Sequence, residues 1–138
     1  MLLKQDFNTH LYPELIDAIS REDDTLLDDA IAAAEQEAKG YLSRYDLDTL
    51  FAATGTDRDA ALMMRLKDMA VWHYIVLANA GTDLELRKTR YDEAIKWLIL
   101  IQSGKVWYKD WPLPPSYNSE GQGDLFQVTS QPKRDTRY

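Results

Sequence analysis

The chain has 138 residues, 45% of them apolar, and a net charge of −7 from 23 acidic and 16 basic side chains. This length and apolar content predict one domain with a hydrophobic core. Cysteine is absent, which excludes disulfides, thiolate metal sites and a cysteine nucleophile. The negative net charge argues against nucleic-acid binding, because contacts with phosphate groups need clustered Lys and Arg.

The first part of the chain predicts one short helix. Residues 1–7 contain no long apolar run, so we expect neither a signal peptide nor a membrane span. Residues 13–19 are expected to be helical, with Pro13 at an early position where its missing N–H costs little. In the polar break that follows, Asp24 or Thr25 is expected to cap the next helix.

A long amphipathic helix is predicted from residue 25 to about residue 45. Its apolar residues recur at steps of three and four, which gives one stripe facing the core: Leu27, Ala30, Ile31, Ala34, Ala38, Tyr41, Leu42 and Tyr45. Residues 46–51 then look like a short turn that ends on an apolar anchor.

Residues 58–80 form the strongest predicted helix, with Thr56 or Asp57 as its cap. Two adjacent sides of this helix are apolar, so we expect it to be the central helix, covered by two neighbours. The expected buried positions are Leu62, Leu66, Met69, His73, Val76 and Ala80 on one side, and Met63, Ala70, Tyr74 and Leu77 on the other.

The last helix is expected to begin at a capping box formed by Thr82 and Glu85, directly after Gly81, and to end at Gly104. Its predicted buried side consists of Arg87, Tyr91, Ala94, Ile95, Leu98 and Ile101. The sequence therefore predicts an all-α fold, a small bundle of about four helices spanning residues 1–104.

Residues 105–138 predict an extended C-terminal tail, because prolines and glycines interrupt any helix. The tail carries five basic and four acidic side chains, which leaves about −8 on residues 1–104. Its aromatic and apolar residues need a surface to cover, either on the chain's own helices or on a partner. We take them as the candidate interface: Trp107, Tyr108, Trp111, Tyr117, Leu125, Phe126 and Val128.

No chemical constellation emerges from the sequence. His10 and His73 lack the converging partners that a catalytic site needs. The acidic residues 22–24, 28 and 29 lack the glycine and terminal Glu of a calcium loop, so helix capping explains them better. The glycines are too far apart for a phosphate-binding loop. We therefore expect a protein that is not an enzyme, without catalytic, metal or cofactor-binding residues.

Three stretches resemble small head proteins of Mu-like prophages and the wider group of phage and prophage head–tail connector (head completion, adaptor) proteins. They are residues 34–46 (AEQEAKGYLSRYD), residues 65–67 (RLK) leading into Ala70 and Tyr74, and residues 90–98 (RYDEAIKWL) with Gly104 and Lys105. The resemblance spans about residues 1–105. The long aromatic and proline-rich tail departs from the shortest members.

This resemblance implies a structural, all-helical adaptor that forms a homo-oligomeric ring on the portal and also contacts tail-completion proteins. It implies a place in the virion, after assembly in the bacterial cytoplasm, with DNA only passing through a channel and no membrane contact. A second hypothesis is a small acidic regulator or inhibitor that binds a host protein through its helical face.

Overall fold

A computed structural model describes residues 1–9, 25–78 and 84–115. Its elements are η1 (Lys4–Thr9), α2 (Thr25–Tyr41), α3 (Leu47–Ala52), η2 (Gly55–Asp57), α4 (Ala60–Ala78) and α5 (Leu84–Gln102), where η denotes a 3-10 helix. The described residues contain no strand. The predicted fold class, a small all-α bundle, is therefore confirmed. The helix predicted at residues 13–19, the capping box at Thr82 and the stop at Gly81 lie outside the described residues.

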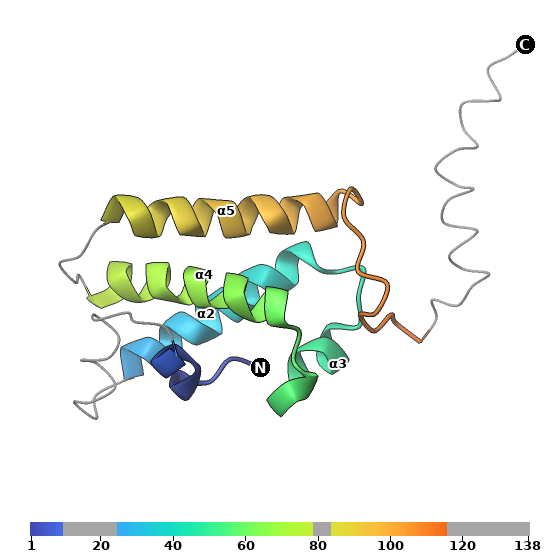
Figure 1. Cartoon of the computed structure of the whole chain (residues 1–138), viewed down its shortest axis with the longest axis horizontal. Coiled ribbons are helices and arrows are strands. Elements are labelled where there is room, and N and C mark those ends of the chain that lie inside the picture. Colours follow the sequence, from blue (N-terminus) through green and yellow to red (C-terminus); the bar gives the residue numbers. More distant parts are fainter. Residues whose placement is uncertain (10–24, 79–83, 116–138) are drawn as a thin grey trace, which may run out of the picture.

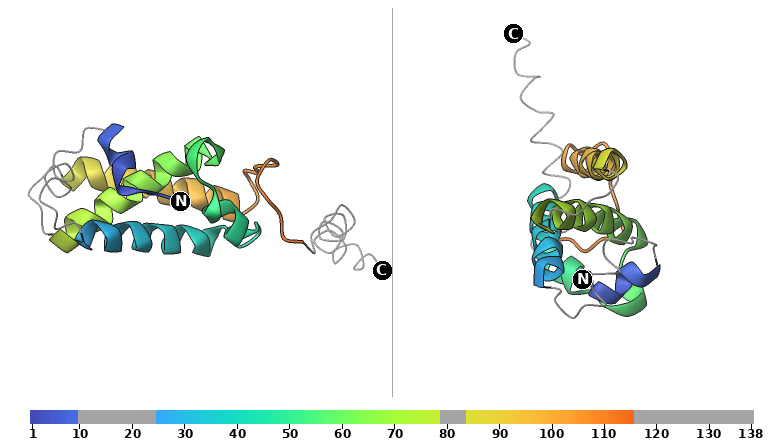
Figure 2. Two further views of the ribbon diagram at one scale, coloured as in Figure 1. Left: turned by 90° about the horizontal axis from the view of Figure 1, so that it is seen from below. Right: turned by 90° about the vertical axis from the view of Figure 1, so that its left-hand side faces the viewer.

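Helix α4 lies between α2 and α5 (Figures 1 and 2), as expected of the central helix. Leu62, Leu66 and Met69 have no exposed surface. Burial extends around much of the helix, and even Lys67 and Asp68 are buried. An element covered on several sides in this way must be apolar on more than one face, which is what its sequence predicted.

Helix α2 presents the predicted apolar stripe to this core. Leu27, Ala30, Ile31, Ala34 and Ala38 are buried. The helix ends at Tyr41, but Leu42 and Tyr45 in the following turn are also buried. Alanine in the middle of the stripe allows close approach of the neighbouring backbone, because its side chain is small.

Two details of α4 differ from the sequence predictions. Its N-terminus is capped by Asp59, whose Oδ1 accepts a hydrogen bond from Leu62 N at 2.8 Å, and not by Thr56 or Asp57. Val76 and Leu77 are 60% and 49% exposed instead of buried. The neighbouring helices cover this side of α4 near its middle, but among the described residues this cover does not continue to its C-terminal end.

In place of the short turn predicted at residues 46–51, the structure has the short helix α3 (Leu47–Ala52). Asp46 caps it, because its side chain accepts hydrogen bonds from the backbone N and the hydroxyl of Thr49. These bonds, with the hydroxyl bond as the strongest influence, hold the pKa of Asp46 below its usual value. The predicted apolar anchor is present, since Leu50 and Phe51 are buried.

Gly104 terminates α5 as predicted. Its φ of 82° is in the left-handed region, which glycine enters without a steric penalty. Gly104 N donates to Ile101 O, and Lys105 N donates to Leu100 O, at 3.1 and 3.0 Å. This pair of bonds is a Schellman motif, which satisfies the last carbonyl groups of a helix and reverses the chain.

The packed part of the chain continues beyond residue 104, the predicted end of the helical domain. Trp111 is 5% exposed and belongs to the hydrophobic core. Val106, Trp107, Tyr108 and Leu113 are partly buried against the same core. Residues 105–115 thus run back over the end of the helical bundle (Figure 1).

Candidate protein-binding surface

Five aromatic side chains meet where residues 105–115 cross the bundle. We call them the aromatic cluster: Tyr45, Trp97, Trp107, Tyr108 and Trp111. Tyr108 and Trp111 stack with their ring centroids 4.6 Å apart, and Tyr45 stacks on Trp107 at 5.2 Å. Trp97 meets the edges of the cluster at 5.7 Å from Tyr108 and 6.1 Å from Trp111. Such pairs add stability beyond the burial of their surface.

Hydrogen bonds hold the aromatic cluster in place in addition to ring packing. Trp97 Nε1 donates a hydrogen bond to the hydroxyl of Tyr108 at 3.1 Å. The backbone N of Tyr108 donates to the hydroxyl of Tyr45, also at 3.1 Å. Trp111 Nε1 donates to Asp59 Oδ2 at 3.0 Å. A backbone hydrogen bond also holds the segment, because Asp46 N donates to Pro112 O at 2.9 Å. The segment is therefore held in one position on the body.

The structure places three residues of the candidate interface in this cluster, namely Trp107, Tyr108 and Trp111. Of the two alternatives for these three, packing on the chain's own helices is the one observed. The other four candidate residues, Tyr117, Leu125, Phe126 and Val128, lie outside the described residues. Their partners Tyr45, Trp97 and Asp59 were not predicted from the sequence, and they come from three separate parts of the chain: the turn after α2, helix α5 and the residue before α4.

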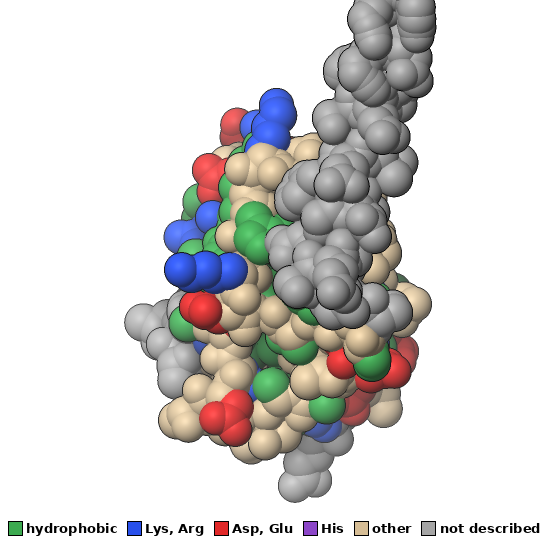
Figure 3. Space-filling model, turned by 90° about the vertical axis from the view of Figure 1, so that its right-hand side faces the viewer, with side chains coloured by type: hydrophobic (Ala, Val, Ile, Leu, Met, Phe, Trp, Pro, Cys, Tyr) green, Lys and Arg blue, Asp and Glu red, His purple; other side chains and the backbone are tan. Residues whose placement is uncertain are grey.

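A groove lies directly beside Trp111, with a volume of about 940 Å³. Its walls come from α3, from residues 57–60 and from residues 110–112. The lining has apolar residues, including Leu50, Trp111 and Pro112, and four carboxylates, Asp48, Asp57, Asp59 and Asp110. On the end of the molecule shown in Figure 3, apolar surface likewise lies between separate groups of acidic side chains.

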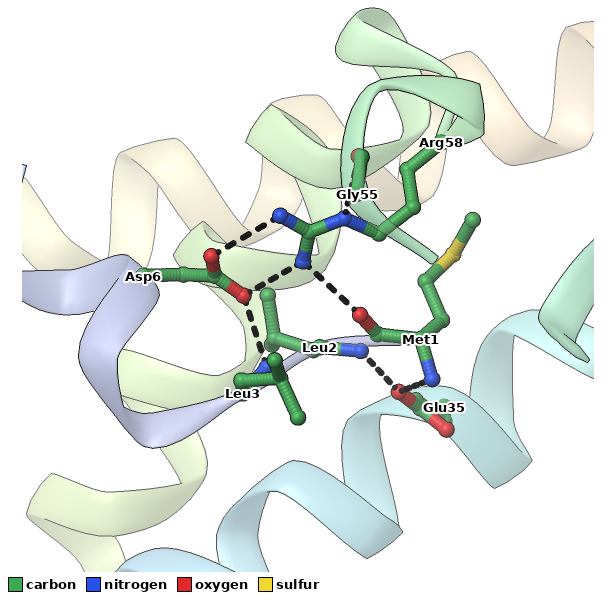
Figure 4. A network of polar contacts seen from close by, with 7 residues as sticks. All are labelled: Met1, Leu2, Leu3, Asp6, Glu35, Gly55 and Arg58. Carbon is green, nitrogen blue, oxygen red and sulfur yellow. Dashed lines mark hydrogen bonds and ion pairs between the residues drawn. The ribbon is translucent and has the colours of Figure 1, made fainter. Parts of the chain in front are cut away.

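The single basic residue in the groove lining, Arg58, is neutralised by a neighbour (Figure 4). Its guanidinium donates to both carboxylate oxygens of Asp6, at 2.7 and 3.1 Å. It also donates to the carbonyl oxygens of Met1 and Gly55, each at 3.0 Å. The hydrogen bonds that it donates to Asp6 raise the pKa of Arg58 further, so it stays charged but is not available to a visiting anion.

Asp6 is held as a carboxylate by the same contacts. Burial would raise its pKa, but the hydrogen bonds from Arg58 and Leu3 N, with the charge of Arg58, together outweigh burial and lower it. On the other side of the N-terminal segment, Glu35 on α2 accepts from Leu2 N at 2.7 Å (Figure 4). Residues 1–9 are thus tied both to α2 and to the wall of the groove.

A second polar group sits between α2, α4 and α5. Glu37 Oε1 is 2.9 Å from His73 Nε2, and Glu37 Oε2 accepts from the hydroxyl of Tyr91 at 2.7 Å. Burial, followed by the bond to Glu37 and its charge, raises the pKa of Tyr91 well above its usual value. His73 therefore lies at a contact between helices, as expected for a structural histidine. Such a shared carboxylate ties three helices together.

Exposed apolar side chains mark the ends of α4 and α5 that are next to residues 79–83. Val76 and Leu77 belong to α4, while Leu84 and Leu86 belong to α5, and each is between 46% and 60% exposed. No cluster of three or more His, Cys, Asp or Glu side chains suited to a metal ion occurs in the described part of the chain. Among those residues, no helix is long and apolar enough to cross a membrane.

Comparison of the chain with models of protein families, with curated proteins and with solved structures found no match.

Proposed function

We propose that this chain is a structural adaptor of the head–tail connector type, which assembles as a homo-oligomeric ring on the portal of a phage or prophage head. The proposal combines the resemblance of residues 1–105 with the geometry of one end of the bundle. It places the protein in the virion, in contact with the portal and with tail-completion proteins.

One observation carries the proposal: residues 105–115 are fastened to the body by the aromatic cluster. The remaining 23 residues, 116–138, therefore start from a fixed point at the end of the bundle. The chain then has two unlike parts that could make contacts, residues 116–138 and the helical body. Contacts between unlike surfaces are head-to-tail, and such contacts give rings when the rotation between copies closes.

The charge distribution is compatible with the same role. The body carries most of the negative charge of the chain, and at the groove the lone base Arg58 is neutralised by Asp6. An acidic surface repels DNA phosphates, so DNA can pass a ring of such bodies without being held. In this arrangement, contacts between proteins hold the ring in place, and contacts with DNA do not.

The test is the native mass of the purified full chain across a concentration series, with negative-stain images of the most concentrated sample and of a mixture with portal. We expect closed rings of uniform size, alone or on the portal. Strict monomers that ignore the portal, together with a stable one-to-one complex with a basic host protein, would favour the acidic regulator instead.

A further inference from the structure

The groove beside Trp111 has the features of a peptide-binding site. We propose that it binds the C-terminal segment, residues 125–137, of a second copy of this chain. The inference rests on the ring proposed above and names the contact that would join neighbouring copies.

The groove offers room and an apolar floor. Ala52, Ala53 and Ala60 line it together with Leu50, Trp111 and Pro112. Pockets that hold drug-sized ligands have volumes of about 300–1,000 Å³. At about 940 Å³, the groove is large enough for several side chains of an extended peptide.

The rim of the groove is acidic and uncompensated by its own lining. Asp48, Asp57 and Asp110 are exposed there, whereas Asp59 is engaged with Trp111 and Leu62. Arg58, the only base in the lining, already pairs with Asp6. The preferred occupant is therefore a segment with apolar residues for the floor and basic residues for the rim.

Residues 125–137 have this composition. The segment begins with three apolar residues, Leu125, Phe126 and Val128, and ends with three basic residues, Lys133, Arg134 and Arg137, against one acid, Asp135. It contains all the basic side chains of residues 116–138. Its apolar and basic side chains are complementary to the apolar residues and the carboxylates of the groove lining.

Geometry and charge favour a neighbouring copy as the donor of this segment. Leu125 is ten residue steps after Pro115. Ten steps span up to about 35 Å when extended, which is enough to reach an adjacent body. Bodies that each carry about −8 repel one another. A basic segment placed between two acidic bodies reduces that repulsion, and it also gives the head-to-tail contact that a ring needs.

Because the chain contains no cysteine, introduced cysteines report the contact directly. A full chain with Ala52→Cys is mixed under mild oxidation with a longer, tagged full chain with Val128→Cys. We expect a disulfide-linked band at the summed mass. Replacing Ala52→Cys by Ala33→Cys, on the exposed face of α2, is expected to reduce that band several-fold.

A charge swap tests the rim independently. Asp48→Lys with Asp57→Lys is expected to abolish the linked band, and so is Lys133→Glu with Arg134→Glu. Combining an Ala52→Cys chain that carries the groove changes with a Val128→Cys chain that carries the tail changes is expected to restore it. Circular dichroism of each variant shows whether the helical body has remained folded.

The outcomes separate this inference from the ring itself. Rings that form without a link between positions 52 and 128, or that ignore the charge changes, overturn the inference and leave the connector function standing. A link that forms only within single chains carrying both cysteines also overturns it, since the occupant is then the chain's own tail. Monomers without any link, with or without portal, overturn both proposals.

Discussion

At the scale of single residues, Asp59 has two structural tasks. One carboxylate oxygen caps α4 through Leu62 N, and the other accepts from the indole of Trp111. Capping side chains contribute about 0.5–2 kcal/mol, and hydrogen bonds to charged groups about 1.5–3 kcal/mol. Because both bonds end on one residue, the start of the central helix and the segment 105–115 stabilise each other.

Trp111 is therefore expected to be sensitive to substitution. Trp111→Ala should lower the free energy of unfolding by about 3–5 kcal/mol, because it leaves a cavity in the core. Trp111→Phe keeps most of the ring but loses the N–H, so it should cost less. Urea unfolding followed by circular dichroism measures both. Val76→Ala, at an exposed position, is the control, and an equal effect of all three changes would contradict the cluster.

Asp6 predicts a pH dependence of stability. Its pKa is lower in the folded protein than the usual value of about 3.9 in an unfolded chain. Its contribution to stability is thus present above pH 4 and is lost as the pH falls through the folded pKa. Asp6→Asn should therefore be less stable than the wild type at pH 7, and the difference should shrink towards pH 2.

Unfolding of both proteins in urea at several pH values checks this expectation. Asp28→Asn is the matched control, because Asp28 pairs with Lys4 at an exposed site, and such pairs contribute little. A difference between wild type and Asp6→Asn that stays constant down to pH 2 would mean that the Arg58 pair does not set the acid sensitivity.

At the scale of elements, a glycine within a helix and a glycine just after a helix have opposite roles. Gly104 has a positive φ, and a Cβ there would lie 3.2 Å from Arg44 Nη1, whereas Gly40 in α2 has open space at that position. Gly104→Ala should destabilise the fold by roughly 1–2 kcal/mol, the cost of the left-handed conformation. Gly40→Ala should stabilise it by about 0.5–1 kcal/mol. Thermal unfolding of the two variants compares them, and the same sign for both would be inconsistent with this account.

The sequence predicts best those helices in which the spacing of apolar residues is regular over many residues. The stripe of α2 and the buried side of α5, with Ala94, Leu98 and Ile101, follow from helical spacing alone. The cap of α4 could not be assigned, because Asp57 and Asp59 have the same intrinsic preference for that position. In the structure the 3-10 turn Gly55–Asp57 comes before α4, so the helix begins at Ala60, two residues later than predicted.

At the scale of the whole molecule, the core depends on residues after α5. A chain truncated after residue 104 should be less stable than one truncated after residue 115. Its free energy of unfolding should be lower by about 3–5 kcal/mol or more, the loss expected when Trp111 is removed. Since domains of this size are stable by about 5–15 kcal/mol, the shorter form is expected to be close to unfolding. Urea unfolding of both forms provides the comparison. Equal midpoints would show that residues 1–104 fold without the aromatic cluster.

The candidate surface was only partly predictable for a related reason. Aromatic residues serve equally in cores and in interfaces, so composition alone left both open for Trp107, Tyr108 and Trp111. Their partners Tyr45 and Trp97 are 63 and 11 residues away from Tyr108 in the sequence. Contacts of that kind depend on the path of the chain over the bundle, which no local pattern encodes. The groove follows from the same path.

The position of Trp111 has an optical consequence. Its indole belongs to the core and also to the wall of the groove. The emission of tryptophan moves to shorter wavelengths when water near the ring is replaced by apolar groups. A peptide that enters the groove would change the light emitted by this residue, whereas Trp72, against Tyr91 on α5, does not line the groove. A shift in the tryptophan emission of the chain is therefore the expected signal of an occupied groove.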